Sequence, residues 1–296
     1  MRQVAQMPNA PPASDRTAVR PDAAPPPILR VESVAKQFET ADGVLEALRD
    51  ISFSVTRGEL VSVIGPSGCG KSTLFKVIGG LERAFDGRVM VDGQTIAGTH
   101  AAIGMVFQEE STFPWRTVID NVAFPLEIAG VRRGERLDKA RELVALVGLR
   151  GFERRYPAEL SGGMRQRVAI ARTLAAEPKI LLMDEPFASL DEQTRLLLGD
   201  KVVQIQQTLR QTTLLITHNI AEAVQLSDRI IVMTYRPGRV KRIVDVDLPR
   251  PRTSEIVGSE AFGRTVAQVW SDLREEATLG LEQDETRLLG AAGPAQ

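Results

Sequence analysis

Short apolar runs alternate with helical patterns along most of this chain. The runs are rich in valine, isoleucine and leucine, which is typical of buried or edge strands. They are ELVSVI (59–64), GRVMVDG (87–93), AAIGMVF (101–107), KILLMD (179–184), TTLLIT (212–217) and RIIVMT (229–234). Because strands interleaved with helices pack in layers, this order predicts an α/β fold with a mixed sheet covered on both faces.

Helical spacing of apolar residues marks the other segments. Residues 191–210 carry apolar side chains at this spacing, namely Leu198, Val202, Ile205 and Leu209. Residues from about 109 to 175 contain no convincing strand, and the clearest of their helical patterns has an apolar face formed by Leu137, Ala140, Val144 and Val147. We therefore interpret 109–175 as a helical insertion into the α/β core.

The two ends of the chain differ from the middle. Residues 1–27 are rich in proline and alanine and lack an apolar h-region, which predicts a disordered tail and not a signal peptide. The main domain is expected at 28–250, and a strand around 240–246 should precede a helical C-terminal extension at 251–279. The apolar side of that helix would carry Phe262, Val266, Val269, Trp270 and Leu273 and pack back onto the body. Residues 280–296 are expected to form a flexible tail.

Composition excludes several classes of protein. Lysine plus arginine number 37 against 38 aspartate plus glutamate, so no overall charge favours nucleic acid or an anionic membrane surface, and no nucleic-acid partner is expected. The single cysteine, Cys69, rules out an intrachain disulfide framework and is compatible with a reducing cytoplasm. No window is apolar for long enough to span a bilayer, so any membrane role must come from a partner.

A phosphate-binding loop is indicated between the run at 59–64 and a helix predicted from Lys71 to about Gly79. The sequence there fits G-x-x-x-x-G-K-[ST], and its residues are Gly65, Pro66, Ser67, Gly68, Cys69, Gly70, Lys71, Ser72 and Thr73. Glycines let successive N–H groups curl around phosphate oxygens, and the helix N-terminus adds its positive end. Lys71 then reaches the β- and γ-phosphates and the Ser72 hydroxyl ligates Mg²⁺, which predicts ATP and Mg²⁺ as ligands. We interpret Cys69 as a small side chain in a crowded turn, in preference to a redox switch.

An acidic pair follows the buried run at 180–183. Asp184 and Glu185 would be explained by a plain strand-end cap if they stood alone. In company with the phosphate-binding loop, Asp184 is predicted to hold Mg²⁺ through water. Glu185 is not assigned to the metal ion and is predicted to polarise the attacking water as general base.

The stretch LSGGMRQR at 160–167 indicates a second anion site. It places Ser161, Gly162 and Gly163 immediately before a helix expected to start near Met164, where N–H groups and the helix dipole attract negative charge. An ordinary capping serine would account for Ser161 alone. It would not explain the two glycines or the pair formed by Gln166 and Arg167.

With these three motifs in this order, the chain resembles the ATP-binding cassette (ABC) family over about residues 28–248. The resemblance implies an α/β P-loop NTPase (RecA-like) core with a mixed β-sheet, an antiparallel β-subdomain and a helical subdomain specific to the family. It also implies that Ser161, Gly162, Gly163 and Gln166 meet the ATP bound to the opposite subunit. Because the chain carries one cassette, two copies would pair head-to-tail around two nucleotides.

The same resemblance assigns further residues. Gln108 is similar to the Q-loop glutamine, which touches Mg²⁺ and the nucleophilic water, and Ser189-Leu190-Asp191 to the D-loop that crosses the dimer interface. His218 resembles the switch histidine on the γ-phosphate, although a core histidine is the usual alternative for such a position. Phe38 would stack on adenine, unless it is an ordinary core aromatic at a strand end.

Other stretches resemble the ATPase subunits of nitrate, sulfonate and taurine importers. These are residues 109–130, 217–233, 235–240 and 247–252. The segment from Gln108 to Trp115 lies where family members receive a helix of the membrane permease. Phe113 and Trp115 are therefore expected to form a partly exposed docking patch, the alternative being a place in the hydrophobic core.

We predict a peripheral ATPase on the cytoplasmic face of the cell membrane, hydrolysing ATP to ADP and phosphate to power uptake through a permease. A solute-binding protein outside would take part indirectly, and the solute would be a small anion-type molecule such as nitrate, a sulfonate or taurine. Two alternatives remain. One is a cassette ATPase in DNA repair or on the ribosome, although the chain lacks a long coiled coil and a second cassette. The other is a nucleotide-gated module without turnover.

Overall fold

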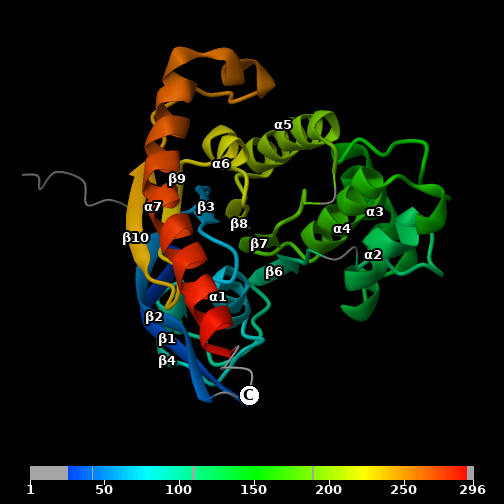
Figure 1. The fold of residues 1–296 in the computed structure, drawn as a ribbon. Coiled ribbons are helices and arrows are strands. Elements are labelled where there is room, and N and C mark those ends of the chain that lie inside the picture. The colour runs from blue at the N-terminus through cyan, green and yellow to red at the C-terminus, as the bar shows by residue number, and fades with distance from the viewer. Residues whose placement is uncertain (1–25, 42, 109–110, 189, 292–296) are drawn as a thin grey trace, which may run out of the picture.

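The computed structural model describes residues 26–41, 43–108, 111–188 and 190–291. Their strands form a four-stranded antiparallel sheet and a six-stranded mixed sheet, flanked by helices (Figure 1). The strands are β1 (Leu29–Thr40), β2 (Gly43–Val55), β3 (Leu60–Ile64), β4 (Asp86–Val91), β5 (Gln94–Thr95), β6 (Ile103–Val106), β7 (Ile180–Asp184), β8 (Thr212–Ile216), β9 (Arg229–Met233) and β10 (Val240–Asp245). This arrangement confirms the predicted fold class.

The helices lie between and after these strands. They are α1 (Lys71–Ile78), α2 (Val118–Ile128), α3 (Arg133–Leu146), α4 (Gly162–Ala175), α5 (Glu192–Leu209), α6 (Ile220–Leu226) and α7 (Glu260–Ala291), with short 3₁₀ turns at Pro157–Glu159 and Ser254–Gly258. No helix among the residues given above combines the length and the apolar character needed to cross a bilayer.

The larger sheet has the strand order β10-β9-β3-β8-β7-β6. All its pairings are parallel except that of β10 with β9. Successive side chains of a strand point to opposite faces of the sheet, and in the central strands β3, β7 and β8 the side chains on both faces are buried. In β8, for example, Leu214 and Ile216 join the core beneath α1 and the antiparallel sheet, whereas Leu215 joins the core beneath α4 and α5. The sheet is therefore covered on both faces, as its apolar runs indicated.

The smaller sheet, in the order β2-β1-β4-β5, packs against the same core as α1. It touches the larger sheet's loops directly, because Gly238 N donates to Ala47 O at 3.0 Å and Arg49 N donates to Gly238 O at 2.9 Å. These bonds join β2 to the loop that connects β9 with β10. This loop also carries Arg236, which lines a cavity together with Lys71.

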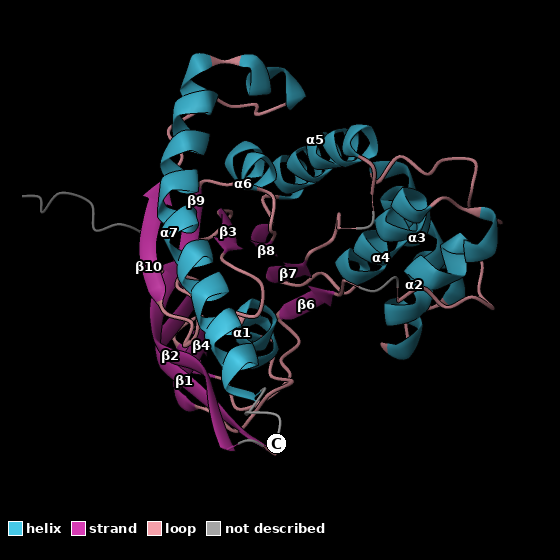
Figure 2. Ribbon diagram, in the orientation of Figure 1, coloured by secondary structure: helices cyan, strands magenta, loops and turns pink. Residues whose placement is uncertain are grey.

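Helices α2, α3 and α4 form a group of their own beside the strands (Figure 2). They occupy the stretch interpreted as a helical insertion, whose described residues contain no strand. Ala140, Val144 and Val147 are buried in the core that α3 shares with α2 and α4, and Leu137 packs against it. Helix α4 begins at Gly162, two residues earlier than expected, because Ser161 caps it and the glycines already have helical conformation.

The C-terminal part differs from expectation in two respects. Helix α7 continues to Ala291 and so enters the stretch expected to be a flexible tail, whose leucines and glutamates are strong helix formers. Trp270 is 53% exposed and does not share the apolar face with Phe262 and Val269. A residue next to Val269 is rotated by about 100° around a helix axis, which turns it away from that face. Similarly, Leu209 at the end of α5 is 44% exposed.

Candidate functional site

The predicted site residues meet at one edge of the larger sheet. Strands β3, β8, β7 and β6 run parallel, so their carboxyl ends lie together, which is where ligands bind to open α/β sheets. Asp184 ends β7 opposite Ile216, the last residue of β8, and Val63 of β3 pairs with the same Ile216. The phosphate-binding loop, the acidic pair and His218 therefore follow neighbouring strand ends, and Gln108 follows β6 at the same edge.

The phosphate-binding loop turns tightly from β3 into α1. Gly68 and Gly70 have φ values of +73° and +100°, and a Cβ at Gly70 would stand 2.7 Å from Ala47 O. Only glycine meets both demands. The Nζ atom of Lys71 lies over the loop and donates to Gly65 O and to Pro66 O, each at 2.9 Å. The lysine charge is thus held inside the curl where phosphate oxygens would enter.

Cys69 lies at the base of this loop and is buried. Burial raises the pKa of its thiol, and the nearby Lys71 ammonium only partly opposes that effect. A thiol that is buried and protonated reacts slowly, since the thiolate is the nucleophile. The interpretation of Cys69 as a small packing residue agrees with this environment.

A cavity of about 420 Å³ opens over the loop. Loop residues Ser67, Gly68, Gly70, Lys71, Ser72 and Thr73 line it, together with Phe38, Leu45, Ala47, Gln108, Glu185 and Arg236. Phe38 is half-buried in β1 and Lys36 Nζ lies 4.6 Å from the centroid of its ring. The smaller sheet therefore offers an aromatic side chain to the cavity that contains Lys71, and adenine stacking on Phe38 stays a prediction.

The residues predicted to hold Mg²⁺ fit a divalent cation. Ser72 Oγ donates to Asp184 Oδ1 at 3.3 Å, and Gln108 lines the same cavity. Burial raises the pKa of Asp184, and the neighbouring Glu185 charge raises it further. A carboxylate destabilised in this way favours a cation beside it. Hydroxyl, carboxylate and amide oxygens are also the donors that Mg²⁺ prefers.

Glu185 and His218 lie side by side, as their positions after neighbouring strands require. Glu185 Oε2 is 3.2 Å from His218 Nδ1, and Glu185 N donates to Ile216 O at 3.0 Å. Glu185 has a φ of +45°, an uncommon value that turns its side chain out of the strand direction. The His218 side chain is 55% exposed, so the alternative of a core histidine is wrong.

A second glutamate, Glu222 in α6, was not found by sequence reasoning. It lines a small pocket with Glu185, Arg195, Thr217 and His218, and its Oε1 atom is buried without a hydrogen-bond partner. Burial raises the pKa of Glu222 to about 7, and the Glu185 charge adds to this effect. Below that pH Glu222 is therefore mostly neutral, and it does not place a second full negative charge beside Glu185.

The raised pKa of Glu222 predicts a pH dependence of stability. The folded state keeps this proton up to a pH of about 7, whereas the unfolded chain releases it near the ordinary glutamate pKa of 4.5. Stability contributed by the group is therefore lost as pH rises through this window, by on the order of 3 kcal/mol. Since glutamine does not titrate, Glu222→Gln should gain stability relative to wild type by about that amount between pH 4.5 and pH 8.

Urea unfolding of both proteins at several pH values measures this difference. The exposed Glu255 provides the control, because Glu255→Gln should show no comparable change over the same range. A stability difference between Glu222→Gln and wild type that stays constant with pH would show that Glu222 ionises normally.

The residues of the LSGGMRQR stretch at 160–167, called the signature below, lie apart from this cavity. Ser161 is exposed and caps α4, its Oγ accepting a hydrogen bond from Met164 N at 3.3 Å. Gly163 packs against α5, where a Cβ would stand 2.9 Å from Thr194 Cγ2. Ser161 and Gly163 border a hollow of about 340 Å³, completed by Met164, Arg167, Thr194, Leu197, Leu198 and Lys201. This hollow shares no lining residue with the phosphate-loop cavity.

Gln166 does not join that hollow. The residue is 3% exposed and its Nε2 atom is buried without a hydrogen-bond partner among the described residues, so the side chain faces into the protein. Helical spacing turns Gln166 away from Ser161, the residue that caps the helix. A contact between Gln166 and nucleotide stays a prediction that this arrangement does not favour.

The segment predicted to form the D-loop is described in part. Ser189 lies outside the described residues. Asp191 caps α5, its Oδ1 accepting a hydrogen bond from Thr194 N at 2.9 Å, and this bond lowers the pKa of the carboxyl. Asp191 therefore has a structural partner in the single chain, and a role in nucleotide binding stays a prediction.

The predicted docking patch lies on the surface beside α2. Residues 109 and 110 fall outside the described residues, but Trp115 is 72% exposed, so the alternative that places it in the core is wrong. Its ring centroid lies 5.6 Å from that of Phe113, which in turn meets Phe124 edge-on at 4.7 Å. The loop is fastened by the buried Asn121, which accepts from Phe113 N at 2.8 Å and donates to Phe113 O at 3.1 Å.

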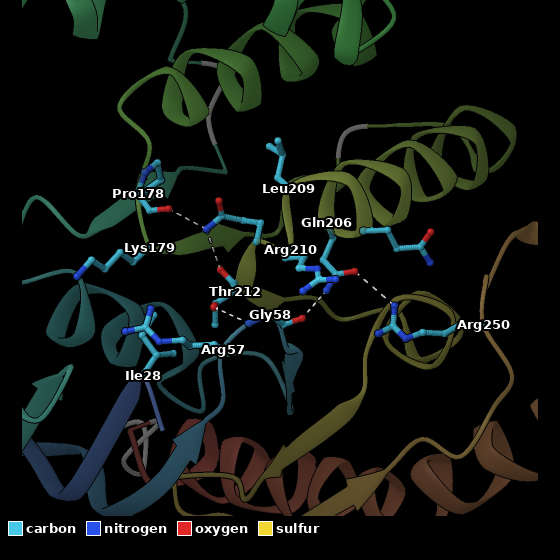
Figure 3. A pocket seen from close by; sticks show the side chains of 12 residues that line it. Ile28, Arg57, Gly58, Pro178, Lys179, Gln206, Leu209, Arg210, Thr212 and Arg250 are labelled. Atoms are coloured by element: carbon cyan, nitrogen blue, oxygen red, sulfur yellow. Dashed lines mark hydrogen bonds between the residues drawn. The ribbon is translucent and has the colours of Figure 1, made fainter. Parts of the chain in front are cut away.

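A larger cavity, of about 690 Å³, lies elsewhere (Figure 3). Its lining includes Thr212 and Lys179, at the amino ends of β8 and β7, so it opens at the opposite edge of the sheet. Arg57 and Lys179 both pair with Asp92, and Arg250 pairs with Asp228. Three of the four cations that line the cavity, all but Arg210, are thus matched by carboxylates, and no motif residue lies there, so this cavity is not the candidate nucleotide site.

Comparison with known proteins gives a consistent result. A family model described as "ABC transporter" matches residues 48–188. The chain is 46% identical to an uncharacterized ABC transporter ATP-binding protein of Methanocaldococcus jannaschii, over 82% of this chain and 91% of that protein. It is 43% identical to an aliphatic sulfonates import ATP-binding protein of Bacillus cereus, over 78% and 90% of the two chains.

Two further similarities extend the comparison. A nitrate import ATP-binding protein of a Synechocystis species is 41% identical over 89% of this chain and 99% of its own length. Among solved structures, an ATP-binding cassette in a dimeric post-hydrolysis state, bound to ADP and Pi, superposes with a TM-score of 0.66. It is 31% identical and covers 75% of this chain and 100% of its own.

Proposed function

This chain belongs to the ABC transporter family, as its motifs predicted, and we propose that it is the ATP-hydrolysing subunit of an importer for a small anion-type solute. One observation carries the enzymatic part of this proposal. Lys71, Gln108 and Glu185 line one cavity over the phosphate-binding loop, and Glu185 lies 3.2 Å from His218. These are the charges and proton acceptors that transfer of a phosphoryl group to water requires.

In the proposed reaction, Glu185 accepts a proton from the water that attacks the γ-phosphorus atom. The bond from that phosphorus to the β–γ bridging oxygen breaks, which releases ADP and phosphate. Lys71 and the loop N–H groups bind the phosphate oxygens, and His218 is placed to donate to the γ-phosphate. Magnesium, held by Ser72, Asp184 and Gln108, would neutralise charge on the β- and γ-phosphates.

The proposal includes a second copy of the chain. A nucleotide over the loop of one copy would be closed by the hollow around Ser161 of the other copy, since the two surfaces share no residue within one chain. The helix N-terminus at Ser161 suits the negative charge of a γ-phosphate. The dimeric state of the similar solved cassette supports this arrangement.

The importer part of the proposal rests on the relatives and on the docking patch. Relatives named as aliphatic sulfonates and nitrate import proteins support uptake of a small anion, with a solute-binding protein and a permease as partners. The exposed Trp115, backed by Phe113, supports a permease contact next to Gln108. The chain would then lie on the cytoplasmic face of the membrane as a peripheral subunit.

Phosphate release from ATP by the purified chain tests the enzymatic proposal. Turnover should require Mg²⁺ and disappear when EDTA is added, because the phosphates would repel one another and the carboxylates. Lys71→Ala should weaken ATP binding by roughly 10-fold or more, since it removes a charged donor to the phosphates. Near-normal ATP affinity in Lys71→Ala would count against the assignment of the phosphate-binding loop. ATP binding without turnover in the wild type would favour the alternative of a nucleotide-gated module that does not hydrolyse ATP.

A further inference from the structure

Arg236 lies in the nucleotide cavity and has no part in the function proposed above. It follows β9 and lines the same cavity as Phe38 and Lys71. Its Nε donates to Gly68 O at 2.9 Å. A Cβ built on Gly68 would stand 2.5 Å from one of its terminal nitrogens. The guanidinium group therefore packs against the phosphate-binding loop at Gly68.

The charge of Arg236 is not matched by a carboxylate of any residue that the structure describes. Within the described ranges its guanidinium forms no ion pair, in contrast to Arg229 and Arg242 on the flanking strands, which pair with Glu59 and Asp272. One N–H group is used on the loop, and the terminal nitrogens carry further donors in a rigid fork. Such a fork is suited to phosphate oxygens, to which it can donate in pairs.

We propose that Arg236 is a further phosphate-binding residue of the nucleotide site, and that helix α7 holds it in place. This inference rests on the proposed binding of ATP over the loop. The ligand class is the phosphate tail of a nucleoside di- or triphosphate. Arg236 would act as a second cation beside Lys71, from a different part of the chain.

The loop that carries Arg236 is fixed to the rest of the protein. Thr234 Oγ1 donates to Pro237 O at 2.9 Å and accepts from Arg239 N at 2.9 Å, which closes the loop on itself. Gly238 is bonded to Ala47 and Arg49 of β2, as described above. These hydrogen bonds restrain the loop that carries Arg236, and so they keep Arg236 beside the cavity.

Helix α7 passes beside β9 and β10 (Figure 1) and contacts Tyr235, the residue that precedes Arg236. Glu276 is buried, and its Oε2 accepts from Tyr235 N at 2.9 Å while its Oε1 lies 3.0 Å from Lys241 Nζ. Gly280, one turn later, packs on the Tyr235 ring so closely that a Cβ would stand 2.9 Å from it. A chain of contacts thus runs from the C-terminal helix through Tyr235 and Arg236 to Gly68.

The first experiment tests the charge of Arg236. ATP affinity is measured by calorimetry with wild type, Arg236→Met, which keeps the stem without the charge, and Arg236→Lys, which restores a charge. Arg236→Met should weaken binding about 10-fold, the effect of losing a charged hydrogen bond, and Arg236→Lys should recover part of that loss. Arg239→Met is the matched control on the same loop, where the side chain is exposed, and should bind as wild type.

Equal affinities for Arg236→Met and wild type would overturn the inference. Equal losses in Arg236→Met and Arg236→Lys would also overturn it, because the role would then be one of shape. Melting temperatures of the variants verify that each is folded. If the wild type itself does not bind ATP, the proposed function fails together with the inference. If the wild type binds ATP and Arg236→Met binds it equally well, only the inference fails.

The second experiment tests the role of α7 by a double-mutant cycle. Glu276→Ala should weaken ATP binding several-fold in the wild-type background and have little effect in Arg236→Met, because it acts through Arg236. Glu275→Ala is the control, since Glu275 also pairs with Lys241 but makes no bond to Tyr235. Equal losses in both backgrounds would disprove the coupling. Should Glu276→Ala not fold, Gly280→Ala, which pushes on the Tyr235 ring, takes its place in the cycle.

Discussion

Glu185→Gln is expected to bind ATP and to lose nearly all turnover. Glutamine keeps the shape of the side chain and a hydrogen bond to His218 but cannot accept the proton of the attacking water. Loss of a general base typically costs on the order of 10²- to 10⁴-fold in rate. With hydrolysis blocked, the nucleotide-bound dimer should accumulate on gel filtration in the presence of ATP, while the wild type returns to the monomer.

Glu177→Gln provides a matched control for this prediction. Glu177 also has a positive φ, +49°, but it pairs with Lys139 at 2.9 Å and does not line the nucleotide cavity. Its replacement should change neither turnover nor the elution volume. A Glu185→Gln protein that hydrolyses ATP at the wild-type rate, or stays monomeric with ATP, would move the general-base role to another residue.

Trp115→Ala is expected to abolish uptake while leaving the isolated subunit intact. The ring is largely exposed in the single chain and would be buried against the permease, and tryptophan is enriched at the centres of interfaces. Its loss should weaken permease association by roughly 2 kcal/mol or more, which is about 30-fold. The permease that co-purifies with the wild-type chain from native membranes provides the assay.

Two controls separate docking from folding. Trp270→Ala removes the other tryptophan, which is also exposed but lies on α7, and should leave co-purification unchanged. Trp115→Ala should melt close to the wild-type temperature, whereas a core tryptophan would cost about 3–5 kcal/mol of stability. A strongly destabilised Trp115→Ala protein that still assembles with the permease would contradict the docking role.

The residues that could be predicted from the sequence are those whose function depends on local geometry. Lys71, Asp184, Glu185 and Ser161 each belong to a strand end or a helix start that a few neighbouring residues define. The contact between Glu185 and His218 follows once both are placed after buried strands, because parallel neighbours end at one edge.

The other contributors depend on contacts between distant segments. Arg236 reaches Gly68 only because the loop after β9 folds against β2, and no spacing in the sequence encodes that approach. Likewise, Glu222 gains its raised pKa from burial beside Glu185, a property of packing. The same limit explains Gln166, since the motif places it on α4 but does not say which face of the helix is buried.

The separation of the phosphate-loop cavity from the hollow around Ser161 bears on how much ATP a cell would consume. If a second copy completes each site, as proposed, subunits too dilute to pair should leave the cellular ATP pool almost untouched, whereas concentrated purified chains pair and hydrolyse ATP. Two subunits held on one permease meet at an effective concentration far above that of free chains, commonly in the millimolar range for tethered partners. The rate of ATP hydrolysis in the cell would then follow the number of assembled transporters and would not rise with surplus ATPase chains.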